Sequence, residues 1–527
     1  MSPSMKAPAD TMTAKSADEG ENELRIGEAI PIKKPFSRLT IFSLTVVLMS
    51  TWEALSRYSP TFTIQHHNLV SDHTIHDSTM SSGLVSGGPV SLIYGFILAI
   101  VGSMATAASL GEMVSMYPTA GGQYHFIAKF APDKWQNILS WFVGWIGTFG
   151  WVSFTASAPY LAAGMIQGLV VLTCEAYQPQ RWHLSLIYWA LVGFATALNI
   201  WGSRLFSLVE TASLVIHLVG FVVVLIVMWV CVPAKHNATF VFTTFLNSTG
   251  WSSNGLAWCL GMLSSCYVLA GYDGAIHLCE EMVNPETAVP YCMLGSLTIN
   301  DILGFVFLLT ILFCMGDMEN ALDTPTNYPI IEIFRSVTGS SAGSCALTAV
   351  LIIAAWLGTI ALLASTARMV LSLARDRALP FSGYLSQLDA HTDLPKRAII
   401  TTSSLLVLFG LINIASTTAF NAILSLAVLG LHISYLVPIL FFLWRRLSAP
   451  HSLSYGPWRL GRAGVAINVI AIIYLLFTSI FMVFPSYQPV TPSNMNYASL
   501  IFGFVWLMSV VFWIVRGRKE YDGPAVL

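Results

Sequence analysis

Two of the carboxylates inside the long apolar stretches of this chain are the first candidates for chemistry, because an ionised group there is costly and commonly serves a function. One of them, Asp273, stands in the run Gly271-Tyr272-Asp273-Gly274. Two glycines around an aromatic residue and a carboxylate are typical of a helix that is interrupted inside a membrane, where freed backbone groups can hold the charged ends of a solute. The alternative is a packing glycine pair beside a buried carboxylate that is bonded to the backbone.

The other carboxylate, Glu53, is the only ionisable side chain inside the first apolar stretch and stands in the run Thr51-Trp52-Glu53-Ala54. A carboxylate at that position could pair with the ammonium group of a substrate. The alternative is an ion pair or a hydrogen bond that only fixes helix packing. Glu53 is therefore the second candidate for a substrate-binding group.

Further ionisable residues lie in later apolar stretches: Glu210, His217, His277 and His432. Glu210 and His217 are seven positions apart, which places them on one face of a helix. His217 is a candidate for proton coupling, because an imidazole titrates near neutral pH. A hydrogen-bonded core residue is the alternative for each of these histidines.

The composition is that of a membrane protein. Of the 527 residues, 55% are hydrophobic and 10% are charged, against about 25% charged residues in soluble domains. The net charge of -2 argues against a nucleic-acid partner, which requires a basic surface. The sequence contains no P-loop and no H-E-x-x-H motif, and its eight cysteines form no C-x-x-C pair. We therefore expect no cofactor, no metal site and no enzyme activity.

Twelve apolar stretches are each long enough for a helix that crosses a bilayer, which needs about 20 residues. They lie near 39–56, 88–113, 136–172, 184–201, 206–232, 251–282, 291–315, 342–374, 398–416, 418–444, 464–484 and 496–515. Because a backbone in lipid must satisfy its own hydrogen bonds, the expected fold is an all-α integral membrane protein with about 12 transmembrane helices.

The Lys and Arg residues are distributed unequally between the two sides of such a bundle. If the N-terminal tail is cytoplasmic, 21 of the 25 Lys and Arg residues fall in the tail and in the loops on its side. The other four are Arg57, Arg181, Lys235 and Arg335. The positive-inside rule thus predicts that both termini are cytoplasmic. The two N-x-S/T sequons, at Asn237 and Asn247, fall in a loop that this rule places outside.

Three motifs, in this order, resemble the amino acid–polyamine–organocation (APC) superfamily. Residues 112–124 (EMVSMYPTAGGQY) close the second span, and residues 271–281 (GYDGAIHLCEE), followed by Val289-Pro290, form the centre of the sixth. Residues 365–368 (STAR) lead to 374–380 (ARDRALP) at the end of the eighth span. More narrowly, the chain is similar to the fungal amino acid/choline transporter branch, which includes GABA permeases.

The resemblance implies a five-plus-five inverted repeat, in which helices 1 and 6 are broken, plus two extra helices. It implies a substrate site at the unwound centres of the first and sixth spans: Thr51, Trp52, Glu53 and Ala54 with Tyr272, Asp273 and Gly274. It places Glu112 and Arg368 near the cytoplasmic gate. It also implies secondary active transport, usually proton-coupled, and similar proteins carry amino acids, GABA, choline or polyamines. The first span here reads Thr-Trp-Glu-Ala where family members often have a glycine-containing break.

Residues 57–77 depart from the family pattern, because they are polar where the first span should still be in the membrane. Removing them would join Ser56 to Ser78 and restore one long, broken helix. We weigh three interpretations: a retained intron, whose 21 codons would suit a short fungal intron; a genuine extracellular loop; and a metal or pH sensor built from the four histidines of this stretch.

The chain thus divides into a disordered cytoplasmic tail, a twelve-helix transporter domain and a short C-terminal tail. The boundaries are 1–38 for the first tail, 39–516 for the domain (repeats 39–232 and 251–444, extra helices 464–516) and 517–527 for the second tail. We expect proton-coupled transport of a small amine-bearing solute across the plasma membrane, or alternatively the vacuolar membrane. A non-transporting nutrient sensor on the same fold is the alternative function.

Overall fold

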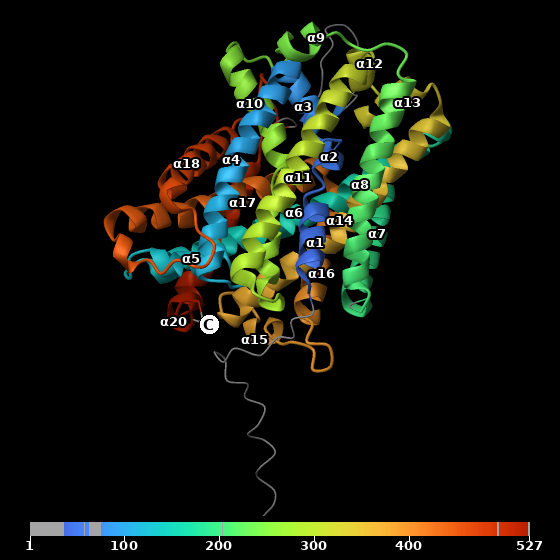
Figure 1. Ribbon diagram of the computed structural model, residues 1–527. Coiled ribbons are helices and arrows are strands. Elements are labelled where there is room, and N and C mark those ends of the chain that lie inside the picture. The colour runs from blue at the N-terminus through green and yellow to red at the C-terminus, as the bar shows by residue number, and fades with distance from the viewer. Residues whose placement is uncertain (1–35, 57, 63–74, 203, 493–494, 525–527) are drawn as a thin grey trace, which may run out of the picture.

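The computed structural model describes residues 36–56, 58–62, 75–202, 204–492 and 495–524 (Figure 1). Most of the expected tail at 1–38 and much of the atypical stretch at 57–77 therefore lie outside the described residues. The part of that stretch that is described forms two short antiparallel strands, β1 (Tyr58–Phe62) and β2 (Ile75–Ser78), with Tyr58 opposite Ser78. The three interpretations of this stretch stay predictions.

Ten helices of the described chain are long and apolar enough to cross a membrane. They are α4 (Gly88–Met116), α6 (Gln136–Thr173), α7 (Arg181–Trp201), α8 (Phe206–Cys231), α11 (Pro285–Cys314), α14 (Ser341–Arg375), α16 (Lys396–Ala415), α17 (Thr417–Ser448), α18 (Gly464–Phe481) and α19 (Ala498–Phe512), the last continuing to Glu520. Each coincides with one expected span, so the all-α membrane fold is confirmed.

The first and sixth spans are broken into short helices, which is why they are missing from those ten. Their pieces are α1 (Arg38–Met49) with α2 (Thr51–Ala54), and α10 (Asn254–Val268) with the 3-10 helix η1 (Tyr272–Glu281). The breaks fall at Ser50 and Gly271, whose φ angles of 41° and 98° lie in the left-handed region. With these two broken spans the described bundle has the twelve crossings that the sequence predicts.

Corresponding helices of the two halves pack against each other. α4 contacts α11, α6 contacts α14 and α7 contacts α16, while α1 packs on α11 and α10 packs on α4. These are the second, third and fourth spans of each half paired with their counterparts, as a five-plus-five inverted repeat requires. The two broken spans therefore occupy equivalent places on either side of one centre.

Serine side chains begin several spans by accepting a hydrogen bond from a first-turn amide, which satisfies one of the free N–H groups there. The capping residues are Ser37 of α1, Ser253 of α10, Ser340 of α14 and Ser416 of α17. Proline stands in the first turn of α4 and α11, where its missing N–H has no cost.

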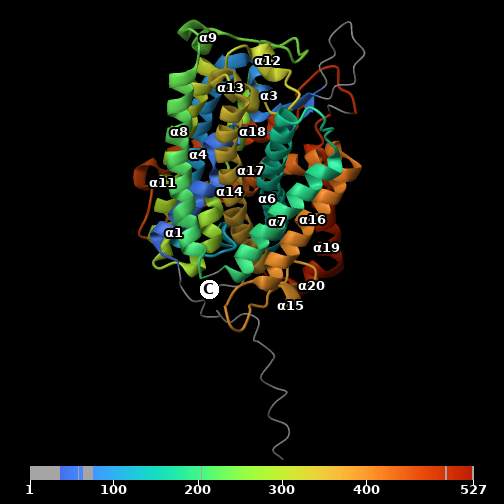
Figure 2. The same ribbon diagram turned by 90° about the vertical axis from the view of Figure 1, so that its right-hand side faces the viewer.

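The bundle has two distinct ends in both views (Figures 1 and 2). One end holds α15 (Ser382–Leu385), α20 (Arg518–Glu520) and the C-terminus, and we call it the terminus side. The other end holds α9 (Ala238–Thr243) and α12 (Met318–Leu322), and we call it the far side. The outer helices expose large apolar side chains such as Leu208, Val230 and Leu507, as expected of a surface in contact with lipid.

Candidate substrate site

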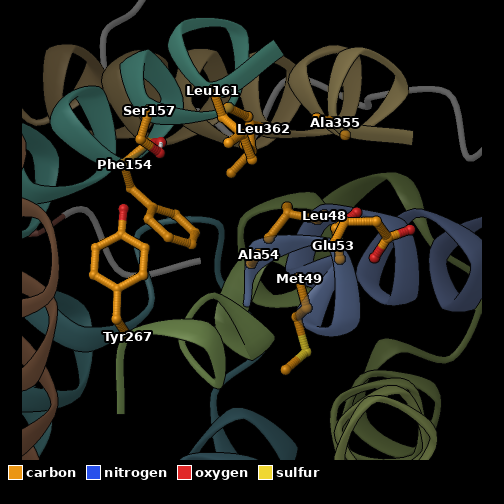
Figure 3. Close-up of a pocket in the computed structure, with 13 residues that line it drawn as sticks. Leu48, Met49, Glu53, Ala54, Phe154, Ser157, Leu161, Tyr267, Ala355 and Leu362 are labelled. Carbon is orange, nitrogen blue, oxygen red and sulfur yellow. Dashed lines mark hydrogen bonds between the residues drawn. The ribbon is translucent and has the colours of Figure 1, made fainter. Parts of the chain in front are cut away.

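A small cavity lies where α1 breaks, at the centre of the bundle (Figure 3). Its volume is about 30 Å³, enough for a water molecule or two. It is lined by Leu48, Met49, Ser50, Glu53, Ala54, Phe154, Ser157, Ala158, Leu161, Tyr267, Ala355, Gly358 and Leu362. These residues come from the first, third, sixth and eighth spans, and Phe154 and Tyr267 lie at one end with Glu53 at the other (Figure 3).

The break at Ser50 is held open by a side chain of α11. Asn300 accepts a hydrogen bond from the Thr51 amide at 3.1 Å and donates one to the Val46 carbonyl at 3.1 Å. In a continuous helix the Thr51 amide would donate to the Val47 carbonyl, and leaving this amide unpaired in a buried site would be costly. The Val46 carbonyl also accepts from the Ser50 amide at 3.2 Å. Gly358 of α14 lets the two helices approach, since a Cβ there would lie 3.1 Å from the Val47 carbonyl oxygen.

Glu53 is buried and forms a short hydrogen bond with His217 of α8, in which His217 Nδ1 lies 2.7 Å from Glu53 Oε1. Within the described part of the chain, Glu53 Oε2 and His217 Nε2 have no hydrogen-bond partner. The structure thus brings together two residues that the sequence placed on separate spans. One carboxylate oxygen is engaged by the histidine and the other retains its capacity to accept.

The neighbours of Glu53 face different ways. Thr51 donates its hydroxyl to the Val268 carbonyl at 2.9 Å and so ties the two broken spans together. Trp52 is fully buried and packs edge-on against Phe307, with ring centroids 5.2 Å apart, outside the cavity lining. Ala54 lines the cavity. Of the four expected residues in this run, Glu53 and Ala54 reach the cavity.

The break at Gly271 is enforced by close packing. A Cβ on Gly271 would lie 2.8 Å from both Leu48 and Phe154, and one on Gly274 would lie 2.7 Å from Leu48. Leu48 and Phe154 both line the cavity, so the glycine run lies directly against its wall. Tyr272 is buried and its ring lies 5.6 Å from that of Tyr435 on α17.

Asp273 is occupied by protein donors and does not line the cavity. Gln123 and Trp151 donate to its Oδ2 at 2.6 and 3.2 Å, and the Tyr435 hydroxyl donates to its Oδ1 at 2.5 Å. His277, on the same short helix, has Nε2 3.6 Å from Oδ2. This carboxylate therefore ties η1 to α5 (Gln123–Phe130), α6 and α17, which fixes the broken helix in place.

Two ion pairs lie on the terminus side of this network, where η1 ends. Arg368 of α14 donates to both oxygens of Glu281, from Nε at 2.5 Å and from Nη2 at 3.0 Å. Arg375 Nη1 lies 2.7 Å from Glu280, whose other oxygen accepts from the Ala120 amide at 3.0 Å. Together the two ion pairs hold α14, η1 and the segment after α4 against one another on the terminus side of the cavity.

Glu112 belongs to a different cluster. Its carboxylate accepts from Arg446 at the end of α17 and from the Leu460 amide. Arg446 also donates to Asn468 of α18 at 2.8 Å. Glu112 therefore joins the second, tenth and eleventh spans, and within the described residues it forms no hydrogen bond or ion pair with Arg368 or its partner Glu281.

Glu210 and His432 do not line the cavity. Glu210 and His217 are both buried on α8 while Leu208 and Val215 are exposed, so the seven-residue spacing does define one buried face. In the described chain neither oxygen of Glu210 has a hydrogen-bond partner. His432 is bonded to the Thr478 hydroxyl at 2.8 Å, which is the arrangement of a hydrogen-bonded core residue.

Sequence reasoning missed the polar residues that support the site from other helices. Gln123 lies in one of the recognised motifs, but nothing in the motif assigns it to Asp273. Asn300 and Tyr435 stand in apolar spans, and a lone amide or hydroxyl there is a signal that a buried polar partner exists. Which partner it is depends on how the spans pack.

A bundle of apolar helices with two broken spans beside a small cavity is the architecture of many membrane transporters. The amino acid permease family model matches residues 40–507, and the chain belongs to this family within the APC superfamily. It is 29% identical to the choline transporter of Saccharomyces cerevisiae over 98% of this chain and 86% of that protein. It is 35% identical to a putative amino acid/polyamine transporter of Macrophomina phaseolina, over 79% of this chain and 92% of that protein. It is 28% identical to amino-acid permease 2 of Neurospora crassa, over 98% of this chain and 92% of that protein.

Proposed function

We propose that this protein is a secondary active transporter that carries a small amine-bearing solute, an amino acid, GABA, choline or a polyamine, together with a proton. The observation that carries the proposal is Glu53, a buried carboxylate that lines the central cavity. Its Oε2 has no partner among the described residues. A buried carboxylate is stabilised by a cation that pairs with it, and an ammonium group is such a cation.

The substrates that relatives are named for share this chemistry. A choline transporter and amino-acid permeases are similar to this chain over nearly its whole length. Choline and amino acids both carry a positively charged nitrogen, so one carboxylate serves either. Phe154 and Tyr267, whose rings lie 6.1 Å apart at the other end of the cavity, supply aromatic surfaces that favour a cation or an apolar side chain.

We assign the coupling proton to His217. Protonated His217 would bind Glu53 Oε1, the atom that it already contacts at 2.7 Å, while the ammonium group of the solute takes Oε2. The two cations then use different oxygens of one carboxylate and can be loaded together, which is the requirement for symport.

Access would alternate by movement of the broken spans. The cavity of about 30 Å³ must widen to admit a solute, and the left-handed residues Ser50 and Gly271 are the hinges we assign to that movement. We place the cytoplasm at the terminus side, which holds most of the Lys and Arg residues. The Arg368–Glu281 pair is then the cytoplasmic gate. Glu112 supports this gate indirectly, because its ion pair with Arg446 holds the second span against the tenth.

The test is uptake by the purified chain in lipid vesicles with an imposed proton gradient. Labelled GABA, choline, a polyamine and a set of amino acids would be compared. We expect saturable accumulation of one class, abolished by a protonophore and reduced at least about tenfold in Glu53→Gln, since the ammonium loses a charged partner. Glu319→Gln, an exposed carboxylate on α12, is the matched control and should transport normally.

Each alternative outcome has a distinct meaning. Uptake that persists in Glu53→Gln would remove Glu53 from the site. Specific binding of a solute without any uptake would instead support the sensor function. Accumulation that is unaffected by the proton gradient would refute proton coupling while leaving transport intact.

A further inference from the structure

Glu210 is a buried acid of α8 to which the proposed transport cycle gives no role. It is 0% exposed, and among the described residues it is the one carboxyl group whose two oxygens are both buried and without a hydrogen-bond partner. An ionised carboxylate in such a place would lose its hydration and gain no partner in return. The carboxylic acid, which carries a proton, avoids this cost.

No charged side chain of a neighbouring helix compensates Glu210 in the described part of the chain. The helices that pack most closely against α8 are α1, α11, α13 (Pro329–Thr338) and α14. Their charged side chains are Arg38, Glu286, Asp301, Glu332, Arg335, Arg368 and Arg375. Arg38 is exposed at the start of α1, and the arginines of α13 and α14 are already paired with Glu332, Glu281 and Glu280. A proton is therefore the cation that neutralises Glu210.

Glu210 lies between the gate pair and His217. It is one helical turn after Phe206, the first residue of α8, whose ring lies 5.5 Å from that of Phe36. The Arg368 Cζ lies 5.8 Å from the centroid of the Phe36 ring, so this end of α8 adjoins the ion pair that we assign as the gate. His217 lies seven residues, about 10 Å, further along the same buried face of the helix.

A serine lies on that face between the two ionisable groups. Positions 210, 213 and 217 have the spacing of one helix face, and Ser213 is buried. Its hydroxyl donates to a backbone carbonyl of its own helix at 2.7 Å, and its oxygen can still accept a hydrogen bond. Each of the two steps, from His217 to Ser213 and from Ser213 to Glu210, is about 5–6 Å along the axis, which one water molecule can bridge.

We propose that Glu210 is the site from which the transported proton is released on the terminus side. This inference rests on the proposed function, in which His217 carries that proton. When the gate pair separates, water reaches Glu210 and its O–H bond breaks, which leaves a carboxylate and a hydrated proton.

The Glu210 carboxylate is then protonated again from inside the protein. Protonated His217 gives up the proton on Nε2, which has no partner in the described chain, and keeps the proton on Nδ1 that faces Glu53. Ser213 and water pass the Nε2 proton to Glu210. The sum of the two steps moves one proton from His217 to the terminus side, and Glu210 is a neutral acid again, as it must be before this end closes around it.

The first measurement is infrared spectroscopy of the purified full chain in lipid, which needs no transport. At neutral pH we expect the carbonyl stretch of a protonated carboxyl group that Glu210→Gln removes. Glu319→Gln, at an exposed site on α12, and Asp301→Asn, at a buried acid of α11, are the matched controls and should leave this band in place. If Glu210→Gln removes no such band, Glu210 is not the neutral acid and the proposal is overturned.

The second measurement compares net uptake with solute exchange in loaded vesicles. Glu210→Gln should lower proton-driven net uptake at least about tenfold, because a positioned acid commonly speeds a proton transfer by more than this. Exchange of labelled for unlabelled solute should persist, since it needs no proton release. Glu210→Asp keeps an acid in a shorter side chain and should restore part of the net uptake, whereas a role in packing alone would favour Gln, which has the size of Glu.

The outcomes distinguish this inference from the proposed function. Proton-driven uptake that survives Glu210→Gln, or an Asp variant that transports less than the Gln variant, would refute the release site and leave the proposed function standing. Uptake by the unmodified protein that ignores the proton gradient would refute the proposed function, and the release role with it.

Discussion

His217 Nδ1 lies 2.7 Å from Glu53 Oε1, and this contact joins the fifth span to the break in the first. Both side chains are buried in the centre of a bundle whose outer surface is apolar. A carboxylate and an imidazole held at this distance can exchange or share a proton on the time scale of a transport cycle. The pair is therefore the place where proton and solute would be coupled.

Replacing His217 with Gln should separate coupling from binding. We expect exchange of labelled solute across the membrane to persist, because Glu53 remains, while accumulation against a gradient is lost. Uptake by the unmodified protein should rise as external pH falls, and the variant should lose that rise. Uptake at several pH values measures this, with the exposed His391→Gln as control. A variant that still accumulates solute with an unchanged pH profile would exclude His217 as the proton carrier.

Asn300 should matter for stability as well as transport. Asn300→Ala removes the partner of the Thr51 amide and one of two donors to the Val46 carbonyl, which keeps the Ser50 amide. One unsatisfied buried amide should cost about 1–3 kcal/mol. Thermal unfolding in detergent would show the loss, and Asn320→Ala, at an exposed site on α12, should show none. Equal stability of the two variants would mean that the break needs no support from α11.

The Arg368–Glu281 pair should be sensitive to the loss of either partner. Arg368→Gln leaves Glu281 without its bidentate partner at a mostly buried site, which should destabilise the closed gate by about 3–5 kcal/mol. Faster solute leakage from loaded vesicles would report this. Arg335→Gln breaks an exposed pair with Glu332 and should cost about 0–1 kcal/mol. If loaded vesicles that contain Arg368→Gln leak solute no faster than vesicles with the unmodified protein, this pair is not the gate.

Gly271 should tolerate no side chain. Alanine there would adopt a φ of 98° and bring its Cβ within 2.8 Å of Leu48 and Phe154, so we expect loss of uptake at normal expression. At Gly193 of α7, nothing lies within 4 Å of the position that a Cβ would take, and Gly193→Ala should be neutral or stabilise the helix by up to about 1 kcal/mol. Normal kinetics for Gly271→Ala would contradict the hinge that we assign to this residue.

The two sequons offer a test of orientation. Asn237 caps the start of α9 on the far side and is exposed, whereas Asn247 is partly buried and its amide donates to the Trp251 carbonyl at 2.9 Å. If the far side is extracellular, we expect a glycan at Asn237 in a eukaryotic host. Endoglycosidase treatment should shift the mobility of the unmodified protein and of Asn247→Gln, but not of Asn237→Gln. Modification of engineered sequons on the terminus side instead would reverse the topology.

The sequence by itself determined the class of fold. Apolar stretches long enough to span lipid, separated by loops with a strong bias in Lys and Arg, leave few arrangements other than a helical bundle. Glycines at 271 and 274 also marked the break in the sixth span, because backbone at a positive φ favours glycine. The break in the first span was less visible, since it falls at Ser50 and depends on Asn300 from another helix.

Only the tertiary structure decided what each carboxylate does. Glu53 and Asp273 are alike in sequence terms, since each is an acid beside the break of a broken span. Asp273 proves to be bonded by Gln123, Trp151 and Tyr435, while Glu53 keeps an oxygen without a protein partner in the described chain and lines the cavity. The difference arises from side chains more than a hundred residues away, whose approach is set by helix packing and is not encoded in local pattern.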